Sequence, residues 1–202
     1  MKDLTRGSIA PQLIRFSIPL ILGNLFQLTY NAVDSIIVGK FAGTQALAAV
    51  GCANPVMNIV ILGITGICIG ASVLMSEFYG AGRYEELKKE ISTTLLFGCY
   101  FSLAVVALGL IFSPWILAVF GVPEEILGAA SLYLRIIFVG MPFTYLYNAV
   151  SSAMRSVGDS KTPIKFLALA SVLNGCLDLV FVGGLKMGVM GAALATVIAE
   201  AA

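Results

Sequence analysis

Two aspartates, Asp34 and Asp178, lie inside long apolar stretches of the sequence, and neither has an obvious basic neighbour. Placing a carboxylate near the centre of a bilayer costs roughly 2.5–3.5 kcal/mol on insertion scales. Acidic residues at such positions usually face a cavity, where they take up a proton or a cation. The two aspartates therefore indicate an ion-coupled membrane protein.

The first aspartate ends a row of polar residues at helical spacing. Asn24, Gln27, Asn31 and Asp34 follow one another at intervals of three, four and three residues, so a helix places them on one stripe. Such a stripe either lines a cavity or joins helices through hydrogen bonds worth about 0.6 kcal/mol each. Joining helices needs no ionisable group. We therefore predict that Asn24, Gln27 and Asn31 line a cavity that contains the acid.

The second aspartate shares a helix face with an amide, because Asn174 precedes Asp178 by four residues. Counted from the outer ends of the predicted helices, these two residues and Asp34, Tyr133 and Thr196 lie roughly 6–14 Å deep. Around a common cavity, the acids could bind a proton as a pair. They could instead hold Na⁺, with the Asn174, Thr196 and Tyr133 oxygens as further ligands. For Asp178 alone, a structural hydrogen bond with Asn174 is the alternative.

Composition supports a membrane protein and excludes several other classes. Of 202 residues, 59% are hydrophobic and only 11% are charged, against about 25% charged in soluble domains. The net charge of +1 provides no basic surface for nucleic acid. There is no histidine, which excludes Ser-His-Asp and Cys-His nucleophiles and imidazole metal sites in this chain. We expect no enzyme, and no cofactor other than H⁺ or Na⁺ as a coupling ion.

The apolar stretches predict an all-α, polytopic membrane protein. A spanning helix needs about 20 mainly apolar residues, and six stretches qualify or nearly qualify: 12–38, 46–75, 92–113, 127–153, 162–183 and 188–202. Together they form one six-helix lobe covering residues 1–202. Alternate loops carry nine basic residues against two, which predicts a cytoplasmic N-terminus in the cell membrane. The nine are Lys2, Arg6, Arg15, Arg83, Lys88, Lys89, Arg155, Lys161 and Lys165, and the two are Lys40 and Lys186.

Three further features concern the ends and interiors of these helices. The last stretch would rise only about 22 Å, short of a ~30 Å core, so we expect a longer natural protein. Pro19 removes a backbone donor inside the first stretch and should kink that helix. Gly63, Gly66 and Gly70 would form one smooth face for close helix packing, with hinge use as the alternative.

Four groups of residues give the chain a specific resemblance over nearly its whole length. They are Phe16-Ser17-Ile18-Pro19 with Asp34-Ser35; Gly80-Ala81-Gly82; Ala153-Met154-Arg155-Ser156-Val157-Gly158-Asp159 with Thr162-Pro163; and Asn174-x-x-x-Asp178 with Gly188-Val189-x-Gly191-Ala192-Ala193-x-Ala195-Thr196. In this order they resemble the N-terminal half of a prokaryotic multidrug and toxic compound extrusion (MATE) transporter.

The resemblance implies one six-helix lobe of a twelve-helix protein that exports cationic or amphipathic compounds against Na⁺ or H⁺ entry. It also implies a cation site at Asp34, Asn174, Asp178 and Thr196 with Tyr133 nearby, and a first helix that bends at Pro19 on protonation. The second lobe is missing from this sequence, so a second copy or a separate partner would have to complete the pathway.

Two other functions fit parts of the sequence. A lipid-linked oligosaccharide flippase of the same superfamily shares the helical plan but usually has several basic residues in its cavity. Here Arg135 is the only basic residue deep within a span, since Arg15 and Lys165 lie close to span ends, and we expect it to extend to the interface or to pair with an aspartate. An intramembrane aspartyl protease would use the two carboxyls as a dyad. Its usual Gly-x-Gly-Asp sequence is incomplete at Ser156-Val157-Gly158-Asp159.

Overall fold

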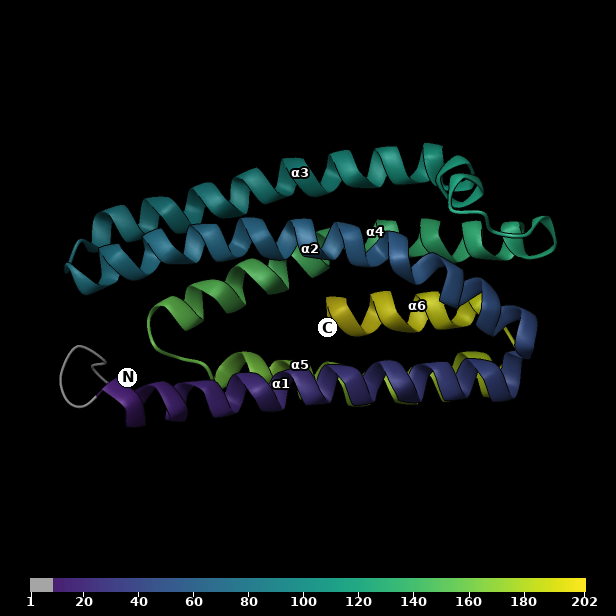
Figure 1. The fold of residues 1–202 in the computed structure, drawn as a ribbon, viewed down its shortest axis with the longest axis horizontal. Coiled ribbons are helices and arrows are strands. Elements are labelled where there is room, and N and C mark those ends of the chain that lie inside the picture. Colours follow the sequence, from purple (N-terminus) through teal and green to yellow (C-terminus); the bar gives the residue numbers. More distant parts are fainter. Residues whose placement is uncertain (1–8) are drawn as a thin grey trace.

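The computed structural model describes residues 9–202, and every regular element among them is helical (Figure 1). The predicted all-α fold class is confirmed. The elements are α1 (Ile9–Ile37), the π-helical segment η1 (Val38–Ala42), α2 (Thr44–Gly80), α3 (Tyr84–Val119), α4 (Glu124–Ser156), α5 (Thr162–Asp178), the π-helical segment η2 (Leu179–Gly184) and α6 (Gly188–Ala201).

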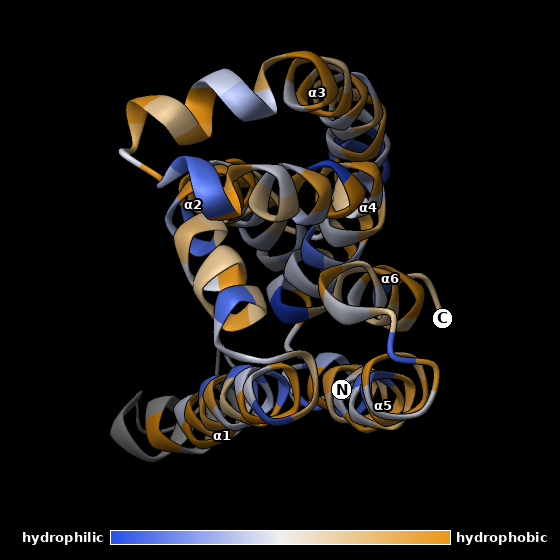
Figure 2. Ribbon diagram, turned by 90° about the vertical axis from the view of Figure 1, so that its right-hand side faces the viewer, coloured by the Kyte–Doolittle hydropathy of each residue, from blue (hydrophilic) through white to orange (hydrophobic). Residues whose placement is uncertain are grey.

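The helices form two groups that α6 joins. Helix α4 packs against α2 and α3, and these three helices make the larger group. Helix α1 packs mainly against α5. Viewed along the bundle, α1 and α5 lie together on one side, and α6 lies between α5 and α4 (Figure 2). The two predicted aspartates are therefore on the two helices of the smaller group.

Most helices differ in length from the predicted spans. The spans 46–75 and 92–113 are parts of α2 and α3, which leave only residues 81–83 between them outside a helix. Pro114 lies inside α3, although we predicted a loop from residue 113 to 125. The added turns carry charges such as Glu85 and Lys88, which form an i,i+3 ion pair of 2.9 Å. Backbone hydrogen bonding can continue past an apolar span because polar side chains there remain solvated.

Glycines with a positive φ end α2 and α3. Gly82 has φ of 72°, and the next residue, Arg83, donates its N–H back to the Phe78 carbonyl at 2.8 Å. Gly121 has φ of 73°, and Val122 donates in the same way to Leu117. Both are Schellman-type ends, in which a left-handed residue lets the chain satisfy the last carbonyls and turn back. These turns place α3 antiparallel to both α2 and α4.

Apolar surface faces outward as well as inward. Helices α2, α3 and α4 and the continuous stretch Thr162–Gly184 are long and apolar enough to cross a membrane, and α6 is apolar but shorter. In the most apolar window of α2, and likewise of α3, only 17% of residues are buried. Side chains such as Leu62 and Ile111 are about two-thirds exposed. An apolar exterior of this kind is suited to lipid, as expected of a multi-pass membrane protein.

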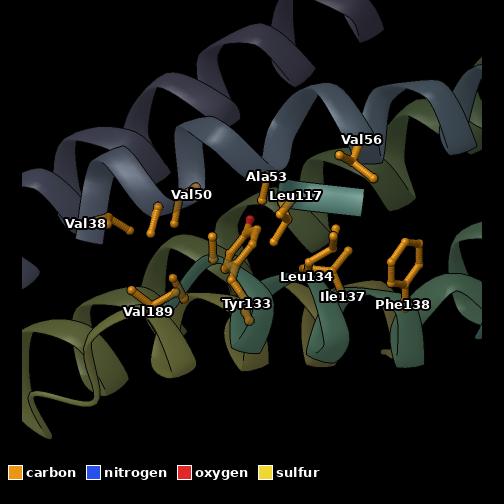
Figure 3. Packing of buried hydrophobic residues seen from close by; sticks show 14 of the residues in the cluster. Val38, Val50, Ala53, Val56, Leu117, Tyr133, Leu134, Ile137, Phe138 and Val189 are labelled. Carbon is orange, nitrogen blue, oxygen red and sulfur yellow. The ribbon is translucent and has the colours of Figure 1, made fainter. Parts of the chain in front are cut away.

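The buried core lies mainly between α2 and α4 (Figure 3). Two glycines of α3 let α4 approach closely. A Cβ at Gly98 would lie 1.6 Å from Cε1 of Tyr145, and one at Gly109 would lie 2.2 Å from Cδ2 of Phe138. The Tyr145 hydroxyl also donates to the Thr94 carbonyl at 2.9 Å, which holds the ring in place.

The glycines predicted to form the close-packing face are elsewhere. A Cβ at Gly63, Gly66 or Gly70 would meet no described atom within 4 Å, and all three residues are exposed. The packing prediction was therefore wrong for these three. The spacing alone does not show which side of a helix faces a neighbour.

Some predictions concern residues outside the described part of the chain. Lys2 and Arg6 precede it, and the side chains of Arg15 and Pro19 are also outside the description. The kink at Pro19 and the orientation of the chain across the membrane remain predictions.

Candidate functional site

The two aspartates occupy matching places in the fold. Asp34 lies in the last turn of α1 and Asp178 is the last residue of α5, so each acid directly precedes a π-helical segment. Asp34 is 9% exposed and Asp178 is fully buried. Their side chains lie close enough to interact with each other. Because two neighbouring carboxyls share their titration, such a pair can hold one proton between them.

The outer oxygens of the pair have no partner. Oδ1 of Asp34 and Oδ1 of Asp178 are both buried without a hydrogen bond. Among the side chains that the structure describes, the ion pairs are Arg83 with Glu86 and Lys88 with Glu85, so neither aspartate has a basic partner among them. Two unpaired carboxyl oxygens in a buried position are costly unless a proton or a cation is available to them.

Asn174 and Thr196 connect α5 and α6 beside the acids. With the Asn174 amide nitrogen facing Asp178, that nitrogen donates to Oδ2 at 2.8 Å, and the amide oxygen accepts from the Thr196 backbone N–H at 3.1 Å. With the amide reversed, its nitrogen donates to Thr196 Oγ1 at 3.3 Å. Either orientation joins the predicted residues of α5 and α6. The first also provides the acid with a donor, and it is the better arrangement for an ionised Asp178.

Two tyrosines extend the site, and only one was predicted. Tyr133 of α4 is 3% exposed and lies within the apolar cluster between α2 and α6 (Figure 3). It is within electrostatic range of Asp34 and Asp178. Tyr30 of α1 lies near the Thr196 side chain and lines the same cleft as Asn174, and it was missed. Its position one turn before Asp34, on the same face of the helix, was the available signal.

The remaining polar residues of α1 are arranged differently from the acid at its end. Asn24, Gln27 and Asn31 are exposed, whereas Asp34 is buried. A cleft of about 220 Å³ between α1 and α5 reaches Tyr30 and Asn174, but none of the three amides lines it. It is lined by Phe26, Thr29, Tyr30, Val33, Ala168, Ser171, Val172, Asn174 and Gly175. The cavity-lining role of the three amides remains a prediction.

Two further charged residues lie on the helices around the pair. Arg135 is exposed and its Nε donates to Ser113 of α3 at 3.0 Å, so it does not pair with an aspartate as one prediction allowed. Glu200 of α6 was missed. It accepts a hydrogen bond from Thr144 of α4 at 2.5 Å and lies one turn beyond Thr196. Its place close to the end of the sequence gave little context for recognising it.

The arrangement offers oxygen atoms only. The described residues contain no group of three or more His, Cys, Asp or Glu side chains that could hold a metal ion. Carboxylate, amide and hydroxyl oxygens from Asp34, Asp178, Asn174 and Thr196 suit a hard monovalent cation or a proton better than a transition metal.

Comparison with known proteins gives a consistent result. The model of the MatE family matches residues 19–180. The chain is 36% identical over 202 residues to the probable multidrug resistance protein YoeA of Bacillus subtilis and 32% identical over 198 residues to YpnP of the same organism. Each match covers 98% of this chain and 44% of the relative, so the chain spans less than half the length of these relatives.

A solved structure has the same arrangement of helices. The MATE multidrug transporter DinF-BH, solved in complex with R6G, is 30% identical to this chain with a TM-score of 0.90. The match covers all of this chain and 46% of that one.

Proposed function

Because the chain belongs to the MatE family, we propose that it is the ion-coupling lobe of a secondary active multidrug efflux transporter. The proposed reaction is antiport. Entry of H⁺ or Na⁺ at the carboxyl pair drives export of amphipathic or cationic compounds. The names of the relatives support multidrug export.

The buried pair of neighbouring carboxyls carries this proposal. Two acids in contact cannot both be ionised cheaply, so the pair changes its hydrogen bonding when it gains or loses a positive ion. One acid is on α1 and the other on α5. Occupancy therefore acts directly on the packing between two helices. A shift of this kind is what couples ion binding to a change in access.

The residues present fit either coupling ion. A proton would occupy the bond between the two carboxyls. Na⁺ would instead use the unpartnered oxygens of Asp34 and Asp178 together with oxygens of Asn174 and Thr196. The same buried oxygens serve both ions, and for that reason the ion must be determined by experiment.

The transport pathway needs more than this lobe. The relatives are more than twice as long as the chain. We propose that a second lobe, from the same polypeptide or from another copy, faces this one and completes the path. The exposed amides of α1, Asn24, Gln27 and Asn31, would then line the path.

Efflux fits the site better than the two alternatives. A flippase for pyrophosphate-linked sugars needs buried basic residues, whereas the buried charged groups here are acidic. An aspartyl protease needs a peptide to reach both acids, and Asp178 has no exposed surface.

The decisive experiment measures ethidium efflux from proteoliposomes that contain the complete protein, under imposed Na⁺ or pH gradients. We expect one gradient to drive efflux and Asp34→Asn or Asp178→Asn to abolish the gradient dependence. Undiminished gradient-driven export by either variant would refute the coupling role. Peptide cleavage lost in the same variants would support the protease instead.

A further inference from the structure

Glu200 is a carboxylate on a membrane helix that the coupling reaction does not use. It lies on α6, and the side chain of Thr144 on α4 donates to its Oε2 at 2.5 Å. No ion pair among the described side chains includes it. One hydrogen bond from a hydroxyl does not compensate the charge of a carboxylate on such a helix. Glu200 can therefore still bind a positively charged group.

Glu200 differs from the aspartates in its accessibility. Its side chain is exposed, whereas Asp34 is 9% exposed and Asp178 is fully buried. It follows Thr196 by one turn of α6, at a rise of about 6 Å. A ligand too large to reach the aspartates can therefore contact Glu200 without displacing the hydrogen bonds of Asn174 and Thr196.

An accessible aromatic ring lies on helix α1. Tyr30 lines the cleft between α1 and α5 and interacts electrostatically with Glu200, whereas Tyr133 is 3% exposed and is closed to a ligand. A carboxylate near an accessible aromatic ring is a recurring arrangement for binding ammonium groups, because the charge and the ring face both attract a cation. A small hydrated ion gains less from ring faces than an organic cation does.

We propose that Glu200 is a specificity-determining residue that binds the positively charged nitrogen of an organic cation, separately from the carboxyl pair that binds the coupling ion. The inference rests on the proposed efflux function, and it adds the residue that favours positively charged compounds over neutral ones. Thr144 is its positioning residue, because its hydroxyl fixes one carboxylate oxygen and leaves the other for the ligand.

The test compares ethidium with dihydroethidium, which has nearly the same ring system without the permanent positive charge. The binding affinities and transport rates of both are measured with the complete protein in proteoliposomes. We expect Glu200→Gln to weaken ethidium binding by about tenfold, the loss of one good charge interaction, and to leave dihydroethidium unchanged. Glu200→Asp should restore part of the preference for ethidium. Glu125→Gln, at an exposed acid in the first turn of α4, is the control and should change neither dye.

Three outcomes would overturn the proposal. Equal weakening for both dyes would mean that Glu200 has only a structural role. Unchanged ethidium binding in Glu200→Gln would mean that it does not contact the cation. In either case gradient-driven transport by the wild type would still support the efflux function. If the wild type transported neither dye, the efflux function itself would fail, and this inference with it.

Discussion

Helices pack more closely within the group of α2, α3 and α4 than within the pair of α1 and α5. In the first group, aromatic rings lie directly on glycines, as Tyr145 does on Gly98 and Phe138 on Gly109. Between α1 and α5, a Cβ at Gly23 would lie 3.4 Å from Ile164, which is ordinary contact. Each region contains a cleft, of about 220 Å³ between α1 and α5 and of about 260 Å³ among α2, α3 and α4.

The two regions also differ in how their polar groups are satisfied. The buried Tyr145 hydroxyl of the first group donates to a backbone carbonyl of α3. At the end of the second group, an oxygen of each aspartate is buried without a partner. The first group also contains an unpartnered hydroxyl, that of Ser131, but its buried polar side chains are all neutral, whereas the acids of α1 and α5 change charge when an ion binds. We therefore expect α2–α4 to act as the frame and α1 with α5 to be the part that responds to the ion.

The largest expected effect is at the acid pair. Asp34→Asn replaces an ionisable carboxyl with a neutral amide that cannot gain or lose a proton. The packing of α1 against α5 should then no longer respond to the coupling ion. We expect gradient-driven ethidium efflux to fall to background while the protein keeps its melting temperature within a few degrees. Gradient-driven efflux and thermal unfolding, measured on the same preparation, check both points. If the variant unfolds, Asp34 is needed for the stability of the fold, and the division into a rigid and a responsive part is wrong.

The glycine contacts test the frame directly. Gly98→Ala forces a methyl group into the Tyr145 ring, and overpacking of this kind costs typically 1–3 kcal/mol. We expect a clear drop in melting temperature, while each folded molecule retains its coupling. Gly23→Ala, at the α1–α5 interface, is the matched control and should be nearly neutral. Equal losses in the two variants would mean that the interfaces are packed alike.

Two asparagines separate the buried part of the site from its exposed stripe. Asn174→Ala removes a donor to Asp178, and hydrogen bonds to charged groups are worth about 1.5–3 kcal/mol. Its loss destabilises the ionised acid, so the apparent affinity for a coupling proton should rise by about tenfold or more, whereas the affinity for Na⁺, which loses a ligand oxygen, should fall. Asn31→Ala, on the exposed stripe, should change either affinity less than about twofold. Titrating ethidium efflux with the coupling ion distinguishes the two variants. A larger effect of Asn31→Ala would mean that the ion binds at the exposed polar stripe of α1.

The smallest expected effect is at the loop between α4 and α5. Asp159 Oδ1 accepts from the backbone N–H groups of Lys161 and Thr162 at 3.1 and 3.0 Å. Hydrogen bonds from the Thr162 side chain and backbone hold the pKa of Asp159 below its usual range. A lowered pKa stabilises the fold above the unfolded pKa, and this stabilisation is lost as the pH falls through the folded value.

Asp159→Ala should therefore lower stability by about 1 kcal/mol at neutral pH, as for a lost helix cap. The difference should close in acid, below the folded pKa. Melting temperatures across pH 3–7 measure it, with Lys161→Ala as a control that keeps the backbone donor. A difference that persists in acid would mean that the carboxylate charge is not the cause.

The sequence brought attention to the acids because they are charged residues within apolar stretches. Helical spacing put Asn174 on the face of Asp178, and counting from the helix ends put Thr196 at a similar depth, so the sequence predicted that they could meet, while their role in coupling remains a prediction. The family resemblance is confirmed as well, since it depends on motifs in a fixed order.

The remaining features depend on which way a helix face points, and spacing alone does not decide that. Gly98 and Gly109 were missed as packing positions because only the fold brings Tyr145 and Phe138 onto them. Tyr30 and Glu200 were missed because a single polar residue gains meaning from its neighbours across helices. The π-helical segments η1 and η2 left no signal, since their residues read as ordinary apolar helix followed by a loop.

Those two segments have a geometric consequence. A π turn is closed by a hydrogen bond between residues five apart, instead of four as in an α-helix, so each segment contains one residue more than an α-helical turn. Releasing that residue would swing the following chain through about 100°, the angle of one helical step. Segments η1 and η2 contact each other just beyond the two acids. A change from π to α hydrogen bonding in one segment would therefore displace the other. The short connections to α2 and α6 would then rotate together.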